Sequence, residues 1–179
     1  MSYTLKYHGY ELINTKNVSS HYANVPNIPD DATEFYCENS SLTTLPNLPA
    51  DLNVLHCEHN LLENLPALPS QLNVLHCSHN HLNVLPPLPN TMMANSYLYC
   101  DHNVLEHLPQ LPDNLVELNC SHNKLSVLPD LPDRLSSLHC VHNRLKHLSI
   151  NEHLTILHCQ HNQLKNFPLL PDYMTEIRL

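Results

Sequence analysis

The chain is rich in side chains that bind metals and exchange protons, since its 179 residues include 16 histidines and 7 cysteines. The pattern His-Cys-x-His occurs at residues 56–59, 76–79, 139–142 and 158–161. Imidazole nitrogen and thiolate sulfur are ligands of zinc, which needs three or four ligands converging on one point. Histidine is also the side chain whose charge normally changes between pH 5 and 8. A metal site and a pH switch are therefore two hypotheses, and both depend on where the fold places these residues.

The cysteines recur at a nearly constant interval. Successive cysteines are 20, 20, 23, 20, 20 and 19 residues apart, and most begin a unit of the form Cys-x-x-Asn-x-Leu-x-x-Leu-Pro-x-Leu-Pro. A fixed period of this length is the signature of a solenoid. One cysteine per unit, with an odd total, predicts copies of one buried position rather than a disulfide framework. Unpaired cysteines also fit a reducing cytosol.

Residues around each cysteine alternate between apolar and polar types, which is the period of two expected of a short β-strand. In one unit Leu55 and Cys57 are expected to point inward, and His56 and Glu58 outward. Identical strands that recur in the same direction must pair in parallel, about 4.8 Å apart. The paired prolines that follow, such as Pro66 and Pro69, remove backbone donors and favour an extended or polyproline return path over a helix.

This alternation bears on both chemical hypotheses. His56 and Cys57 fall on opposite faces and cannot share one ion without breaking the strand, so we predict no metal site and no cofactor. A site across units, from His56 and His76 or from His139 and His158, stays open. So does a pH switch, because protonating all 16 histidines would change the formal net charge from −9 to +7. Polar surface side chains copied by repeat duplication are the interpretation that we favour.

Catalytic motifs are missing from the sequence. Gly9 is the only glycine, so phosphate-cradling loops are absent, and no serine stands in a nucleophile-elbow sequence. We therefore predict that the protein is not an enzyme and has no catalytic residues.

The asparagine that recurs at each strand end is expected to satisfy backbone groups on adjacent coils, because its amide both donates and accepts hydrogen bonds. This structural ladder comprises Asn60, Asn80, Asn103, Asn123, Asn143 and Asn162.

Charge is unevenly distributed along the chain. Residues 17–123 contain 11 acidic residues and no Lys or Arg, so their formal charge is −11. Such a surface repels phosphate backbones and anionic lipids, which predicts a protein partner with a basic surface, and neither nucleic acid nor membrane.

No apolar run approaches the roughly 20 residues that cross a bilayer, and the first 17 residues lack the apolar block of a Sec signal peptide. We expect a soluble protein that is not exported by the general pathway.

The pattern Leu-x-x-Leu-x-Cys-x-x-Asn-x-Leu-x-x-Leu-Pro-x-Leu-Pro resembles the leucine-rich-repeat family. More narrowly, it resembles the 20-residue Leu-Pro subclass found in effectors that Gram-negative pathogens inject into host cells. Residues 25–29 fit the proline segment of a degenerate first unit, and Met174, Ile177 and Leu179 occupy the Leu, Leu and Cys positions of a last strand. The resemblance implies a β-rich leucine-rich-repeat solenoid with a parallel sheet of about eight short strands on the concave face and an extended, polyproline convex side.

The length predicts one domain, in which residues 25–179 form about eight repeats ending in an uncapped strand. Residues 1–24 show no helical period, so we expect an irregular or β N-terminal cap instead of the helical cap usual in the family. Some relatives carry a ubiquitin-ligase domain with a catalytic cysteine. That activity cannot be transferred to this chain, because each cysteine here maps to a repeat position.

The resemblance also implies that partners bind the concave face, where side chains point out of the sheet. These outward positions vary between units, and the early units combine tyrosines with acids, a composition favoured at protein interfaces. The three extra residues of one unit, within 90–96, are a second candidate, because insertions in solenoids often form binding loops. The predicted partner-binding residues are Glu34, Tyr36, Glu38, His56, Glu58, His76, Tyr97, Tyr99, Asp101, Glu117, Asn119, His139 and His158.

We therefore predict a protein-protein interaction module. The resemblance implies a virulence effector made in the bacterial cytoplasm and then translocated into the host cytosol, where it binds a host protein. Two alternatives stay open: an inhibitor that blocks another effector enzyme of the same bacterium, and a substrate-recognition fragment of a larger ubiquitin ligase.

Overall fold

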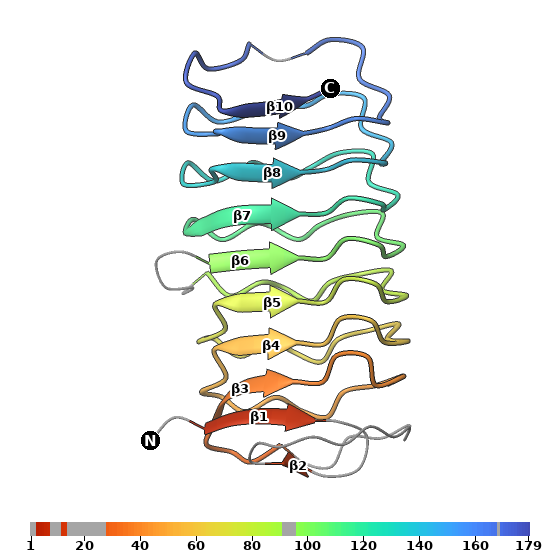
Figure 1. Cartoon of the computed structure of the whole chain (residues 1–179), viewed down its shortest axis with the longest axis vertical. Helices are drawn as coiled ribbons and strands as arrows, with labels where there is room; N and C mark the ends of the chain where they lie inside the picture. The colour runs from red at the N-terminus through yellow and green to blue at the C-terminus, as the bar shows by residue number, and fades with distance from the viewer. Residues whose placement is uncertain (1–2, 8–11, 14–27, 91–95, 168) are drawn as a thin grey trace.

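The computed structural model describes residues 3–7, 12–13, 28–90, 96–167 and 169–179, with only the backbone for residues 3–7 and 12–13. The described strands form a single 10-stranded sheet in the order β10-β9-β8-β7-β6-β5-β4-β3-β1-β2 (Figure 1). They are β1 (Tyr3–Tyr7), β2 (Leu12–Ile13), β3 (Ala32–Tyr36), β4 (Val54–His56), β5 (Val74–His76), β6 (Ser96–Tyr99), β7 (Leu115–Asn119), β8 (Ser137–His139), β9 (Ile156–His158) and β10 (Glu176–Arg178). These residues include no helix, so none of them forms a helix able to cross a membrane.

Strands β3 to β10 are parallel, and each repeat unit supplies one of them. Equivalent residues lie beside one another, so that Leu55 of β4 pairs with Phe35 of β3 and with Leu75 of β5. The predicted solenoid with a parallel sheet is therefore confirmed. The register shifts at Ser96, where the longer unit enters β6. Residues 91–95, the centre of the predicted binding loop, lie outside the described residues.

The sheet continues beyond the repeats at its N-terminal end. Strand β1 pairs in parallel with β3, and β2 pairs with β1 in the antiparallel sense. Both strands fall within the region predicted as an irregular or β cap. The boundary between cap and repeats stays a prediction, because residues 14–27 lie outside the described part of the chain.

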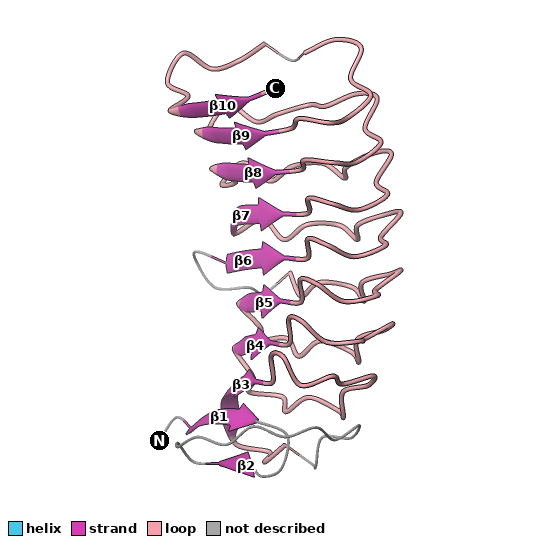
Figure 2. Ribbon diagram, turned by 45° about the vertical axis from the view of Figure 1, so that its right-hand side comes forward, coloured by secondary structure: helices cyan, strands magenta, loops and turns pink. Residues whose placement is uncertain are grey.

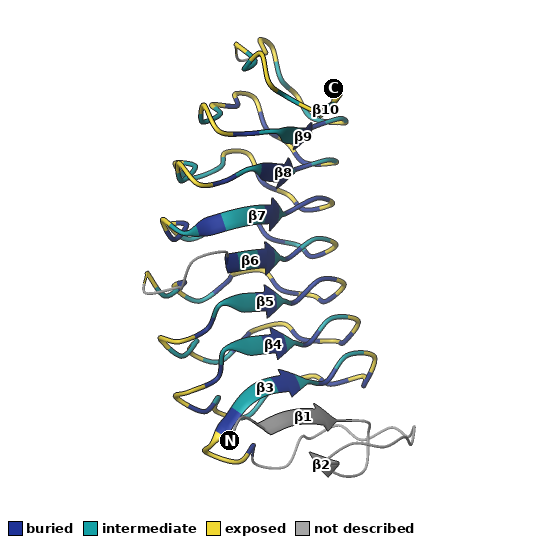
Figure 3. Ribbon diagram, turned by 60° about the vertical axis from the view of Figure 1, so that its left-hand side comes forward, coloured by how far each residue is buried: buried dark blue, intermediate teal, exposed yellow. Residues whose placement is uncertain are grey.

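The core is a set of apolar columns that run along the solenoid. Inward residues in the strands and directly after them, such as Leu55 and Cys57, have no exposed surface, and the same holds for Leu75 and Cys77 of the next unit. Buried and intermediate residues lie along the strands, and exposed residues gather at the turns before the strands, whereas the turns after the strands contain both buried and exposed residues (Figure 3). All seven cysteines are buried and unpaired, as predicted. Burial raises the pKa of the Cys57 and Cys77 thiols well above the usual value, which keeps them protonated and unreactive.

Return segments lead the chain back in extended form (Figure 2). In the segments 45–49, 65–69, 108–112 and 128–132, the second proline of Leu-Pro-x-Leu-Pro begins a turn, because its carbonyl accepts a hydrogen bond from the amide three residues later. The Pro49 carbonyl accepts from the Leu52 amide at 3.2 Å, and the Pro112 carbonyl accepts from the Leu115 amide at 3.0 Å. Proline is tolerated here because this turn position needs only its carbonyl. The prolines thus both exclude a helix and return the chain to the next strand.

Where each strand ends, an asparagine side chain ties two units together. The Asn103 Nδ2 group donates to the Cys77 and Cys100 carbonyls, both at 3.1 Å, and the Asn103 Oδ1 atom accepts from the Leu82 amide at 2.9 Å. The same bonds recur with small changes at the other members of the series, which are Asn60, Asn80, Asn123, Asn143 and Asn162. Because each amide reaches carbonyls of two coils, these side chains fix the spacing between neighbouring units.

Candidate binding surface

The parallel register aligns the outward side chains of β3–β10 into columns, which together we call the sheet face. The central column contains the outward residue near the end of each strand. Its members in order are Tyr36, His56, His76, Tyr99, Asn119, His139, His158 and Arg178. A second column contains Glu34, Val54, Val74, Tyr97, Glu117, Ser137, Ile156 and Glu176.

The first four members of the central column form a continuous run of rings, which we call the aromatic segment. Tyr36 stacks on His56 with 4.8 Å between ring centroids, and His76 contacts Tyr99 at 5.0 Å. His56 and His76 meet edge to face at 5.1 Å. Each ring is half-buried, so the segment presents a partly exposed aromatic strip over β3–β6.

Carboxylates flank the aromatic segment and accept hydrogen bonds from it. The Tyr36 hydroxyl donates to Glu34 at 3.4 Å. Burial, and then the charge of Glu117 with its hydrogen bond, raise the pKa of Tyr99 to about 12. Asp101 accepts at a single oxygen from the Ser78 hydroxyl, at 2.5 Å, and from the Asn119 amide, at 3.0 Å. The phenols are therefore protonated at neutral pH, and this half of the sheet face is negatively charged.

A different series of hydrogen-bonded side chains, here called the serine-histidine series, occupies the C-terminal half of the sheet face. The Ser137 hydroxyl lies 3.0 Å from His139 Nε2, and the Nδ1 atoms of His139 and His158 lie 2.9 Å apart. His158 Nε2 lies 2.9 Å from Glu176, which also pairs with Arg178 at 2.7 Å. Burial and the neighbouring His158 lower the pKa of His139. A neutral His139 fits the serine-histidine series. Its Nε2 atom can accept a hydrogen bond from the Ser137 hydroxyl while its Nδ1–H group donates one to His158.

The hydrogen-bonded order Ser-His-His-Glu resembles the catalytic residues of a serine hydrolase, in which histidine activates the serine hydroxyl. Ser137, however, is poorly placed to attack a substrate. Ser137 is only 7% exposed. A nucleophile also needs donors aimed at the developing oxyanion, and the hydrogen bonds described around Ser137 supply none. The arrangement is better understood as a polar network that satisfies its own members.

All 13 predicted partner-binding residues lie on the sheet face or directly after its strands, and all are partly exposed. The central and second columns contain ten of them, and Glu38, Glu58 and Asp101 follow the ends of their strands. The structure thus brings the predicted residues together over two neighbouring patches. Their role in binding stays a prediction.

Sequence reasoning missed a second histidine column, in the turns after the strands. Neighbouring rings in this column stack nearly parallel, with centroids 4.0 to 4.4 Å apart. The backbone here is left-handed, with φ between 53° and 56°, a region that non-glycine residues seldom adopt. The turn column consists of His59, His79, His102, His122, His142 and His161. The sequence does carry a signal of this column, because in each of these units a histidine stands two residues after the cysteine.

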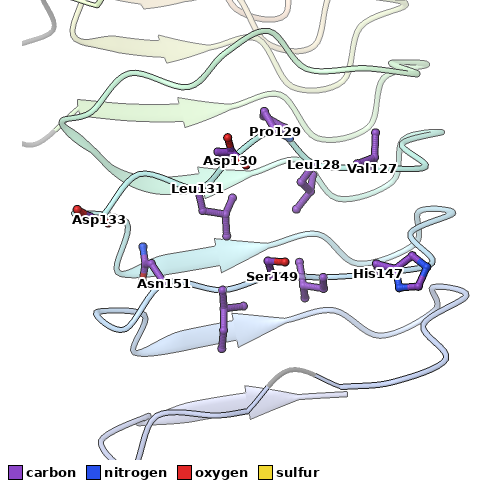
Figure 4. Close-up of a pocket in the computed structure, with 11 residues that line it drawn as sticks. Val127, Leu128, Pro129, Asp130, Leu131, Asp133, His147, Ser149 and Asn151 are labelled. Carbon is purple, nitrogen blue, oxygen red and sulfur yellow. The ribbon is translucent and has the colours of Figure 1, made fainter.

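A shallow pocket of about 460 Å³ lies on the opposite side, between the return segments of two units. Its ionisable side chains are Asp130, Asp133 and His147. Figure 4 shows Asp133 and His147 at opposite ends of the pocket. These groups do not converge on one point, so the pocket offers no set of groups placed for catalysis or metal binding.

Comparison with known proteins finds relatives among solved structures. No protein-family model matches the chain, and no curated protein sequence matches it significantly. YopM from Yersinia enterocolitica superposes with a TM-score of 0.85 at 35% identity, over 90% of this chain and 36% of that one. The leucine-rich-repeat domain of a Shigella effector gives 0.71 at 35% identity, over 78% of this chain and 63% of that one.

A third relative is YopM from Yersinia pestis, described as a leucine-rich effector protein, with a TM-score of 0.69 and 32% identity. It is matched over 86% of this chain and 49% of its own length. The chain thus spans less than two thirds of each of the three solved chains. With the repeat pattern and the parallel sheet, these matches show that the chain is a leucine-rich-repeat solenoid similar to those of bacterial effector proteins.

Proposed function

We propose that this chain is a protein-binding module of a bacterial effector, and that it holds its partner against the sheet face of β3–β7. The observation that carries the proposal is the aromatic segment flanked by carboxylates, at positions where the repeats differ from one another. Solenoids contact only neighbouring units and offer one long surface, which suits binding. Half-exposed tyrosines supply apolar contact area together with a polar tip, which is why they are frequent at interfaces.

The charge of this region indicates the chemistry of the partner. Residues 17–123 contain 11 acids and no Lys or Arg, and several of these acids flank the aromatic segment. A partner with Lys and Arg around an apolar centre would be attracted over distance and fixed in orientation by these charges. The proposed mode of action is therefore recruitment or covering of a basic protein surface, without catalysis by this chain.

The similarity to bacterial effectors supports delivery from the bacterial cytoplasm into the host cytosol as the setting for this binding. A partner within the bacterium, such as another effector enzyme that this chain inhibits, would use the same surface. Capture from host lysate and, separately, from bacterial lysate distinguishes the two settings.

The binding surface is tested with two pairs of substitutions that change charge equally. Glu34→Gln with Glu117→Gln removes two charges from the sheet face, whereas Glu63→Gln with Glu106→Gln removes two exposed charges beyond the strand ends. The first pair should weaken capture of the partner and reduce the salt dependence of binding, and the second should change neither. Tyr97→Ala with Tyr99→Ala should also weaken capture, while the melting temperature shifts by only a few degrees. Equal effects of the two charge pairs would place the partner elsewhere.

A further inference from the structure

Three ligand-type side chains meet on the sheet face at the ends of β4 and β5. His56 and His76 are direct neighbours in the parallel register, and Glu58 follows His56 by two residues on the same face. The Oε1 atom of Glu58 lies 3.4 Å from the Nδ1 atom of His56 and 3.4 Å from the Nδ1 atom of His76. One carboxylate oxygen therefore faces two imidazole nitrogens from two different units.

These separations fit a tetrahedral ion. Zinc binds nitrogen and carboxylate oxygen at about 2.0–2.2 Å, and tetrahedral angles then place neighbouring ligand atoms about 3.3–3.5 Å apart. All three ligand atoms lie within 4.8 Å of one another. The two imidazole planes are inclined by 71°, so lone pairs that lie in those planes can point toward a common centre.

The carboxylate also lacks a full set of partners. The side chain of Glu58 is only 15% exposed, and its Oε2 atom is buried with no hydrogen-bond partner among the described residues. Burying an ionised carboxylate is costly unless a positive charge compensates it. No Lys or Arg occurs between residues 17 and 123, and the ion pairs described for Glu58 are with His56 and His76, so a protonated histidine or a bound ion would supply the compensating charge.

A second cluster, His79, Asp101 and His102, shows why proximity alone is not enough. Its two imidazoles are stacked with only 11° between their planes, so their in-plane lone pairs run side by side instead of converging. Asp101 Oδ2 is 3.9 Å from His79 Nε2, and Asp101 Oδ1 already accepts from Ser78 and Asn119. This cluster serves as a matched control.

We propose that His56, Glu58 and His76 form a binding site for one zinc ion, with a fourth coordination position left to solvent. Two imidazoles and one carboxylate are a donor set that zinc accepts, and the imidazoles are 26% and 30% exposed, which gives the ion access. The site joins two repeat units, and it does not depend on the identity of any protein partner.

The test is calorimetric titration of the full chain with Zn²⁺ at pH 7.5, after removal of metal with a chelator. One ion should bind per chain with an affinity distinct from weaker sites. Glu58→Gln and His76→Gln should each weaken this binding by about 100-fold, since even partners outside the coordination shell typically contribute 10- to 100-fold. Asp101→Asn and His102→Gln should leave it within about twofold.

Thermal melting supplies an independent measurement, because a ligand that binds only the folded chain raises its melting temperature. Excess Zn²⁺ should raise the melting temperature of the parent chain and of Asp101→Asn, but not that of Glu58→Gln. Binding that survives Glu58→Gln, binding that is lost in Asp101→Asn, or no binding by the parent chain would each overturn the proposal.

Discussion

Each repeated asparagine completes the hydrogen bonding of a turn that would otherwise leave polar backbone groups buried. Asn103 is 8% exposed, and its side chain bonds to three carbonyls and one amide. A buried backbone group without a partner destabilises the folded state far more than a made bond stabilises it. The asparagine is therefore required by the backbone around it.

Replacing Asn103 with Ala should lower the free energy of unfolding by about 1–3 kcal/mol, because the groups it satisfies stay buried without a partner. Urea unfolding followed by circular dichroism measures the change. Asn64→Ala, at an exposed position, is the matched control and should have little effect. If both variants unfolded at the parent's urea midpoint, the asparagine series would not have the structural role described.

At the scale of the strand, stability comes from apolar columns whose members have the same environment in each unit. Leu75 is fully buried between Leu55 and Leu98 in the register of the sheet. Truncating such a residue leaves a cavity that its neighbours cannot fill without moving several coils.

We expect Leu75→Ala to lower the free energy of unfolding by roughly 2–5 kcal/mol through lost burial and the cavity it leaves. Leu61→Ala removes the same atoms from a side chain that is 45% exposed, and should have a much smaller effect. Urea unfolding of the two variants compares them directly. Equal losses would show that the inward positions are wrongly assigned.

The strands were predictable because their alternation is local, and the return segments because proline restricts the backbone in any context. The aromatic segment was predictable in part, since a constant period places outward residues in register. The ring geometry was not, because the 71° between His56 and His76 and the 11° between His79 and His102 depend on side-chain packing. Strands β1 and β2 lie outside the repeat, so no period indicated them.

For the whole molecule, the histidines make stability depend on pH. Burial lowers the pKa of His76, His102 and His139, and neighbouring histidines lower it further. The unfolded chain therefore binds protons more readily at these groups than the folded chain does. Their contribution is fully present above the unfolded pKa of about 6.5 and is lost as pH falls toward the lower folded values.

The melting temperature should accordingly fall between pH 7.5 and pH 5 at constant ionic strength. His139→Gln removes one such group and should show a smaller fall than the parent chain. His153→Gln, at an exposed position, is the control and should follow the parent. A melting temperature that rises on acidification would mean that relief of the net negative charge outweighs the burial of neutral histidines.

The asparagine bonds also give the solenoid a direction. Asn80 accepts from the Leu62 amide and donates to the Cys57 carbonyl, both of the preceding unit, and the bonds described for it include none to the following unit. The molecule is thus a one-dimensional lattice with nearest-neighbour coupling, in which each unit completes the one before it. Loss of a terminal unit would only shorten the lattice, whereas a defect near Asn103 would divide it into two blocks that melt separately.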